Sequence, residues 1–100
     1  MIFSTVFTDE AREDAALAVK WYNEQKAGIG DSFLNYLSAS LQKIQNYPTA
    51  YKKIYRQVRQ AAVEKFPYVI LFKVTGEVIT VYAIFHTSQH PKKKFRKLKK

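Results

Sequence analysis

The chain has 100 residues, of which 47% are hydrophobic, 15% aromatic and 25% charged, a composition typical of one small globular domain rather than a disordered chain. The absence of cysteine excludes disulfides, thiolate metal sites and a cysteine nucleophile. No apolar run approaches the roughly 18 residues of a membrane-spanning helix, and the N-terminus lacks a signal-peptide pattern, so we expect a cytoplasmic protein.

The charge is strongly positive and unevenly distributed. Seventeen basic and eight acidic residues give a formal net charge of +9. Residues 90–100 hold seven of the basic residues and no acid, so we predict a basic tail after a single domain at residues 1–89. Six of the eight acids lie at or before Asp31, whereas residues 32–63 contain five basic residues and no acid. This field favours an anionic partner, although a tail that only aids solubility remains the simpler alternative.

The first half of the chain predicts a strand followed by two helices. Residues 2–7 are β-branched and aromatic, as in a strand, and Thr8 supplies an N-cap for the helix that follows. Residues 10–26 carry apolar side chains at helical spacing, with Leu17 and Trp21 beside the stripe. The same spacing returns over residues 33–44. Two helices with one apolar stripe each are therefore expected.

A short turn joins the two predicted helices. Gly28 and Gly30 are both able to take positive φ values, and Asp31 is able to cap the second helix. We therefore expect a helical hairpin that buries both apolar stripes against the rest of the domain.

The second half of the chain has the period of β-strands. Residues 54–59 alternate, residues 66–74 are almost continuously apolar, and residues 78–86 form another apolar segment after a turn. These segments predict an antiparallel meander. The resulting order, β-α-α-β-β-β, predicts an α+β fold of two layers, in which the helical hairpin packs on one face of a small antiparallel-rich sheet.

Side-chain alternation predicts which strand residues face the helices. The expected core set of the last strand is Ile79, Val81, Ala83 and Phe85. Tyr82 and His86 then lie on the open face, and burial of Val58 sends Arg59 to that face as well. The strand at residues 66–74 is apolar on both sides, so we expect a partner or the tail to cover its second side.

Motifs for metal or cofactor chemistry are missing. The sequence has no glycine-rich phosphate loop, and His86 and His90 are spaced by four at a strand end, where they do not converge on a metal. We therefore predict neither a metal nor a cofactor, and no membrane partner. The acids of the first helix fit a dipole role and a solvated face rather than a pair of catalytic carboxylates.

Basic side chains are the remaining candidates for chemistry. RNA cleavage without a metal needs a general base, cations that stabilise the phosphorane, and an acid that protonates the leaving oxygen. Arg59 and His86 are the catalytic candidates if the chain is such a ribonuclease. The candidates for binding nucleic acid or another target are Lys52, Lys53, Arg56, Lys92, Lys93, Lys94 and Arg96. The candidates for binding a partner protein are Tyr68, Ile70, Phe72 and Tyr82. Solvation, packing or a structural hydrogen bond is the alternative role for each.

Several features follow one another at fixed spacing along nearly the whole chain. They are Phe7, Ala11, Asp14, Tyr22, the turn at 28–33, Pro48, Val58 with Arg59, the segment 66–68, the strand at 78–86, and His86 followed by Pro91. No single motif is decisive, but the joint order resembles the RelE/ParE superfamily of toxins from type II toxin-antitoxin modules. The resemblance is closest to the ParE-like, plasmid-stabilisation branch.

The resemblance implies a small bacterial protein that inhibits growth unless a cognate antitoxin wraps an acidic or amphipathic segment over it. ParE-like members poison DNA gyrase, whereas RelE-like members cleave mRNA on the ribosome. The ParE-like pattern has an arginine three residues after the strand-ending histidine, where this chain has Gln89. Gyrase inhibition is the leading hypothesis. A ribosome-dependent endoribonuclease and a degenerate toxin that only binds its antitoxin remain open.

Overall fold

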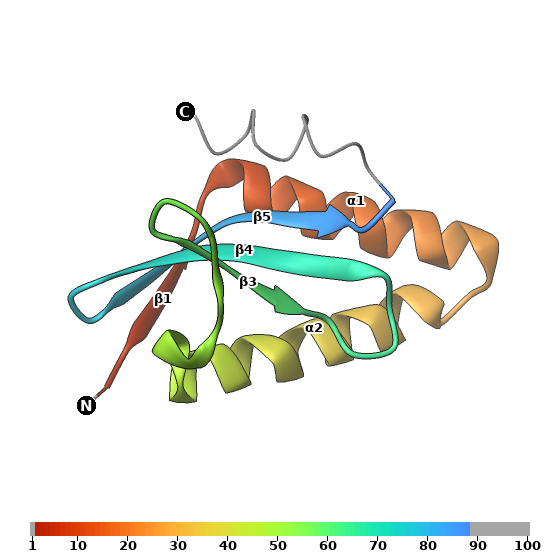
Figure 1. Cartoon of the computed structure of the whole chain (residues 1–100). Coiled ribbons are helices and arrows are strands. Elements are labelled where there is room, and N and C mark those ends of the chain that lie inside the picture. Colours follow the sequence, from red (N-terminus) through yellow and green to blue (C-terminus); the bar gives the residue numbers. More distant parts are fainter. Residues whose placement is uncertain (1, 89–100) are drawn as a thin grey trace.

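The computed structural model describes residues 2–88 (Figure 1). In chain order the elements are β1 (Ser4–Phe7), α1 (Asp9–Gln25), α2 (Ile29–Asn46), the 3-10 turn η1 (Pro48–Ala50), β2 (Lys53–Tyr55), β3 (Val58–Ala62), β4 (Tyr68–Thr75) and β5 (Val78–His86). The predicted α+β class with a helical hairpin on a sheet is confirmed. The predicted basic tail lies outside the described residues, so its boundary stays a prediction.

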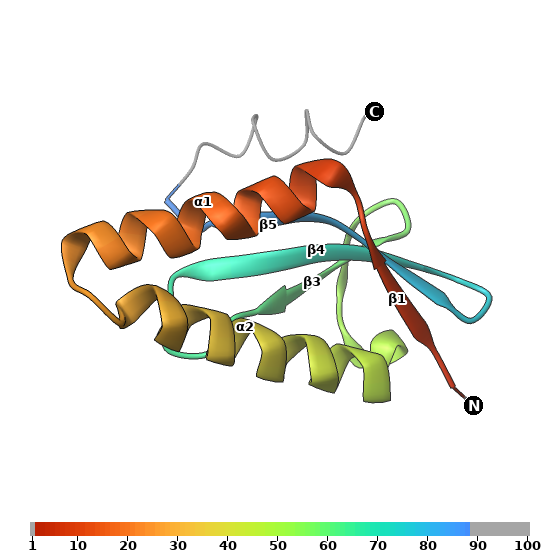
Figure 2. The same ribbon diagram turned by 180° about the vertical axis from the view of Figure 1, so that it is seen from behind.

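The five strands form one mixed sheet with the order β1-β5-β4-β3-β2. β1 pairs in parallel with β5, and all other neighbours are antiparallel. The segment expected as one strand at residues 54–59 is divided between β2 and β3, because Arg56 takes a φ of 50° and turns the chain. Both helices lie side by side on the same face of the sheet (Figure 2).

The helical hairpin is capped by an amide rather than by the predicted aspartate. Gly28, with a φ of 93°, is the N-cap residue of α2. The carboxamide oxygen of Asn23 on α1 accepts hydrogen bonds from the N–H groups of Gly28 at 3.2 Å and Gly30 at 2.8 Å. Asp31 therefore lies inside the first turn of α2, where its charge complements the helix dipole.

Most buried side chains lie between the helices and the sheet. The members of this main core are Ala11, Ala18, Phe33, Leu37, Ile44, Ala61, Val63, Ile70, Phe72, Ile79, Val81 and Ile84. At one end of the core, Phe33 contacts the rings of Tyr22, Phe66 and Tyr68 with centroid separations of 5.0–5.6 Å. A smaller cluster on the opposite sheet face contains Val58, Val69, Leu71, Ala83 and Phe85.

A β-bulge at Tyr82 decides which residues of β5 face the helices. Phe72 of β4 pairs with Val81, whereas the preceding Leu71 pairs with Ala83, so Tyr82 is the extra residue. The bulge reverses the expected alternation: Ala83 lies in the far-face cluster, and Ile84 lies in the main core. The predicted core set is thus right for the first half of β5 and wrong for the second half.

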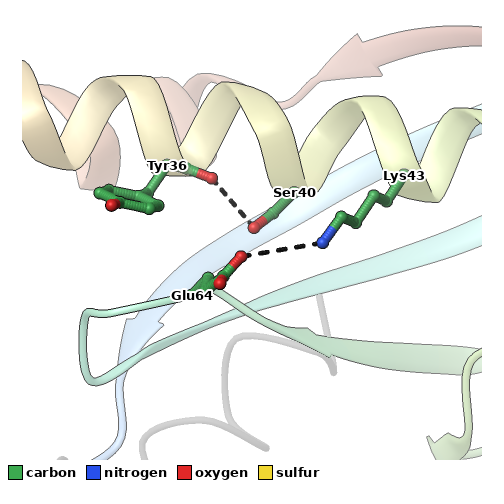
Figure 3. A network of polar contacts seen from close by, with 4 residues as sticks. All are labelled: Tyr36, Ser40, Lys43 and Glu64. Atoms are coloured by element: carbon green, nitrogen blue, oxygen red, sulfur yellow. Dashed lines mark hydrogen bonds and ion pairs between the residues drawn. The ribbon is translucent and has the colours of Figure 1, made fainter.

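Two polar contacts lie along the second half of α2, one within the helix and one to the loop after β3 (Figure 3). The Ser40 hydroxyl, which is buried, donates to the carbonyl of Tyr36 at 3.0 Å. Lys43 Nζ lies 3.8 Å from Glu64 Oε2 in the loop after β3, but both side chains are more than 60% exposed. Such a solvated ion pair contributes little to stability.

Candidate functional site

The predicted basic residues of the described chain gather on the β2–β3 hairpin at one edge of the sheet. Lys52, Lys53 and Arg56 are all exposed there. The Arg56 guanidinium carbon lies 5.3 Å from the centroid of the Tyr55 ring, a cation–π contact. We call Lys52, Lys53, Tyr55 and Arg56 the basic hairpin. The remaining predicted cations, Lys92, Lys93, Lys94 and Arg96, lie outside the described residues.

Arg59 faces the helices and not the open side of the sheet. Its strand partner is Phe72, a residue of the main core, so the pair lies on the helix face. The guanidinium Nη1 donates to the carbonyl of Tyr51 at 2.6 Å and to that of Thr49 at 3.2 Å. Arg59 therefore fastens the connection between η1 and β2. The expected orientation was wrong because Val58, its neighbour, packs in the far-face cluster instead of the main core.

His86 also lies on the helix face, because the bulge at Tyr82 shifts the alternation. Its ring meets the Tyr68 ring edge to face at 5.1 Å. Its Nδ1 accepts a hydrogen bond from the N–H of Ser88 at 3.0 Å, and the Ser88 hydroxyl lies 2.6 Å from the same atom. Since a backbone N–H only donates, the neutral imidazole carries its hydrogen on Nε2. In this tautomer the Nε2–H group is the donor that His86 presents to its surroundings.

The two predicted catalytic residues do not lie together. Arg59 pairs with Phe72 on β4, and His86 pairs with Tyr68 on the same strand. Four residues along a strand and two strand spacings put their backbones about 16 Å apart. Both side chains also make hydrogen bonds that hold them in place. In this conformation they do not converge on one phosphate.

The predicted partner-binding residues have different environments. Ile70 and Phe72 are fully buried under the helices and present no surface to a partner, which corrects the expectation for these two. They are hidden because their side of β4 is the side that the helices cover. Tyr82 is half-buried at the bulge, where its carbonyl accepts from the Thr8 hydroxyl at 3.2 Å. Tyr68 is half-buried and reaches a cavity.

This cavity, the α1–β5 cavity, has a volume of about 410 Å³ and opens between α1 and the adjoining ends of β4 and β5. Its lining is Asp14, Leu17, Ala18, Lys20, Trp21, Glu24, Tyr68, Ile84 and His86. Leu17 and Trp21 are 57% and 54% exposed, although their position beside the apolar stripe favoured burial. Sequence reasoning missed the cavity. The available signal was a pair of large apolar side chains one helical turn apart, just off the stripe.

The polar groups of the α1–β5 cavity are closely connected. Asp14 Oδ2 accepts from the N–H of Ile84 at 3.0 Å. Burial, and then the nearby Tyr22 and Asp14, raise the pKa of Tyr68 above its usual value of 10.0. The Tyr68 hydroxyl therefore keeps its proton at neutral pH. Among residues 2–88, no group of three or more histidines or acids has a geometry able to hold a metal ion.

The far-face cluster does not form an open apolar surface. Val58, Val69, Leu71, Ala83 and Phe85 are at most 8% exposed. The expectation that a partner or the tail covers this face stays a prediction, because the tail lies outside the described residues. A helix long and apolar enough to span a membrane is absent from the part of the chain that the structure describes.

Comparisons with known proteins bear on the fold. No protein-family model matches the sequence, and no curated protein is similar enough to count as a relative. A solved structure described as "Chromosomal ParDE TA system from P. aeruginosa" has a similar fold, with a TM-score of 0.78 and 16% sequence identity. The match covers 87% of this chain and 98% of that chain. The chain therefore shares its fold with a chain of that ParDE system, which agrees with the fold that the sequence resemblance implied.

Proposed function

We propose that this chain is the toxin of a type II toxin-antitoxin module, which a cognate antitoxin neutralises and which inhibits DNA gyrase when it is free. The observation that carries the proposal is the fold shared with a chain of a ParDE system over nearly the full length of both chains. The order of sequence features that resembles ParE-like toxins supports it independently. The proposed site of action is the bacterial cytoplasm, where gyrase works.

Charge supports an antitoxin of acidic or amphipathic character. The chain has a formal charge of +9, and the exposed cations of the basic hairpin form one concentrated positive region. An acidic partner segment would reduce the mutual repulsion of these cations and associate rapidly. Tyr68 and Tyr82 are half-buried and keep part of their surface for the apolar side chains of an amphipathic segment.

The separation of Arg59 and His86 argues against RNA cleavage by these two residues acting together, and gyrase inhibition stays the leading candidate. Arg59 is tied to the carbonyls of Thr49 and Tyr51, and His86 pairs with Tyr68, four residues along β4 from the partner of Arg59. General acid–base cleavage needs both groups at one phosphate. An inhibitor that binds a protein surface has no such requirement.

RNA cleavage on the ribosome is the second candidate, because the basic hairpin combines exposed cations with an aromatic ring. Cations and stacking rings are the groups that bind single-stranded nucleic acid. In that case Lys52, Lys53 and Arg56 would hold the RNA. A degenerate toxin that only binds its antitoxin is the third candidate, and it depends on Gln89, which lies outside the described residues.

The test is expression of the chain alone in bacteria, with growth, mRNA 5′ ends and plasmid supercoiling measured in the same culture. Purified chain is then added in excess to a gyrase supercoiling reaction. Growth arrest with inhibited supercoiling and intact mRNA supports the proposal. Active supercoiling with ribosome-phased mRNA ends contradicts it and supports the endoribonuclease. Normal growth with folded chain supports the degenerate form.

One double variant separates the two active mechanisms. Arg59→Gln together with His86→Gln removes the cation and the imidazole expected of a ribonuclease. If the chain inhibits gyrase through its surface, this double variant still arrests growth, provided that circular dichroism shows it folded. Loss of mRNA cleavage in the same variant would instead assign cleavage to these residues.

A further inference from the structure

We propose that the α1–β5 cavity binds the side chain of an arginine that a partner protein presents. The inference does not depend on whether the chain acts on gyrase or on the ribosome. The cavity volume of about 410 Å³ lies within the usual range of ligand sites, which begins at roughly 300 Å³. Its lining combines aromatic rings, carboxylates and aliphatic groups, the three kinds of group that a guanidinium on an aliphatic stem contacts.

Aromatic rings form one part of the lining. Trp21 on α1, Tyr68 on β4 and His86 on β5 reach the same cavity from three elements. The edge-to-face contact of Tyr68 and His86 holds these two rings at a fixed angle of 83°. A guanidinium is planar and weakly hydrated, so it stacks on such rings better than an ammonium does.

Hydrogen-bond acceptors form the second part. A guanidinium carries five N–H donors and no acceptor, so its site must supply acceptors. The carboxylates of Asp14 and Glu24 lie in the lining, and a carboxylate accepts several hydrogen bonds at once. The backbone N–H and carbonyl groups of Phe85 and Thr87 point toward β4, as the bond from the Thr87 N–H to the Pro67 carbonyl shows. Because these groups alternate along an antiparallel strand, the N–H and carbonyl of Ile84 point away from β4, and its carbonyl faces the α1 side.

The local charge of the α1–β5 cavity differs from that of the rest of the molecule. The chain carries +9, but the cavity lining holds two carboxylates and one ammonium, that of Lys20. Lys20 and Glu24 are both exposed and lie one helical turn apart, so a lysine–glutamate contact there leaves Asp14 as the second carboxylate of the lining. The cavity is thus a locally acidic site on a basic protein, and it complements a cation.

The rim points to a protein as the source of that cation. Leu17 and Trp21 lie one turn apart on the outer side of α1, and both are more than half exposed. A free amino acid would leave them in water, whereas a protein segment around the arginine would cover them. Tryptophan, tyrosine and arginine are the residue types in which the hot spots of protein interfaces are enriched.

Trp21, the only tryptophan of the chain, makes the test direct. The full chain, labelled with ¹⁵N, is titrated with the capped peptide Gly-Arg-Gly. We expect the indole N–H of Trp21 and the amides of Ile84 and His86 to shift saturably. Two control peptides replace the arginine. The citrulline peptide keeps the aliphatic stem and a planar end group but has no charge, and the lysine peptide has a charged ammonium that is not planar. Both should bind at least about threefold more weakly.

Variants in the cavity complete the test. Glu24→Gln and Trp21→Leu should each weaken the arginine peptide about three- to tenfold, since each removes a charge-assisted bond or a stacking face. Glu13→Gln, on the same helix but outside the lining, is the matched control and should bind normally. Each variant's own spectrum reports whether it is folded.

Three results would overturn the proposal. The first is an absence of shifts at the cavity amides with any peptide. The second is equal binding of the arginine and citrulline peptides, or equal binding by Trp21→Leu and the unaltered chain. The third is a shift of the cavity resonances in Arg96→Gln without peptide, which would assign the cavity to the chain's own arginine.

Discussion

The carboxylate of Asp14 accepts a hydrogen bond from the backbone N–H of Ile84, 70 residues further along the chain, at 3.0 Å. β1 ends at Phe7, so the outer edge of β5 has no neighbouring strand beyond Val81. α1 replaces the missing strand with side chains. The Thr8 hydroxyl donates to the carbonyl of Tyr82, and Asp14 takes the N–H two residues later.

We predict that Asp14→Ala lowers the free energy of unfolding by about 1–3 kcal/mol, because the Ile84 N–H is left without its acceptor in a partly buried place. Asp14→Asn keeps an oxygen acceptor and should lose less. The measurement is urea unfolding followed by circular dichroism. Glu13→Ala, an exposed acid on the same turn, is the control and should change stability by no more than about 0.5 kcal/mol. Equal losses at positions 13 and 14 would contradict the assigned role.

Thr8 has two roles at the start of α1, since its hydroxyl also accepts from the N–H of Ala11 at 3.1 Å. Thr8→Ala removes the N-cap and the bond to Tyr82 together, and we expect a loss of about 1–2 kcal/mol in unfolding free energy. Thr8→Ser keeps the hydroxyl and should retain most of the stability. If serine and alanine are equally destabilising, the lost methyl group rather than the hydroxyl explains the effect.

Gly30 is required by close packing rather than by its backbone angle. A Cβ on Gly30 would overlap the carbonyl oxygen of Val19 and the side chain of Asn23. Gly30→Ala should therefore push the two helices apart and lower the unfolding free energy by about 1–3 kcal/mol. Ser32→Ala, at an exposed position one turn into the same helix, is the control. A neutral Gly30→Ala variant would show that the helices do not approach as closely as described.

Stability should fall at alkaline pH because burial raises the pKa of Tyr68 in the folded state. The unfolded chain releases the phenol proton near pH 10, whereas the folded chain retains it to higher pH. The free energy of unfolding therefore falls as the pH rises from about 10 toward the higher pKa of the folded chain. Below pH 10 the contribution is fully present. We expect Tyr68→Phe to lose less stability than the unaltered chain between pH 8 and about 11. Tyr47→Phe, at a position 73% exposed, is the control and should follow the unaltered chain.

Local sequence patterns were sufficient for the helices and for the order of elements. Thr8 caps α1 as predicted, because an N-cap depends only on neighbouring backbone groups. The apolar positions Phe33, Leu37 and Ile44 of α2 are buried as their spacing required. The cap of α2 was beyond local reasoning, since Asn23 belongs to the preceding helix.

The candidate site shows the limit of the same reasoning. Alternation placed Arg59 and His86 together on an open face, but a single extra residue at Tyr82 turned His86 toward the helices. The predicted assignment of faces on β3 was wrong as well, because Val58 packs in the far-face cluster and not in the main core. The α1–β5 cavity joins residues from α1, β4 and β5 that are up to 72 positions apart.

The sequence by itself determined the α+β class, the helical hairpin, the positive charge and the resemblance to ParE-like toxins, since these follow from periodicity, composition and residue order. Only the tertiary structure decided which face each strand side chain occupies, where Arg59 directs its guanidinium, and that Trp21 borders a cavity. The physical reason is register. Strand pairing is a long-range contact, and one bulged residue reverses every side chain beyond it without leaving a local signal.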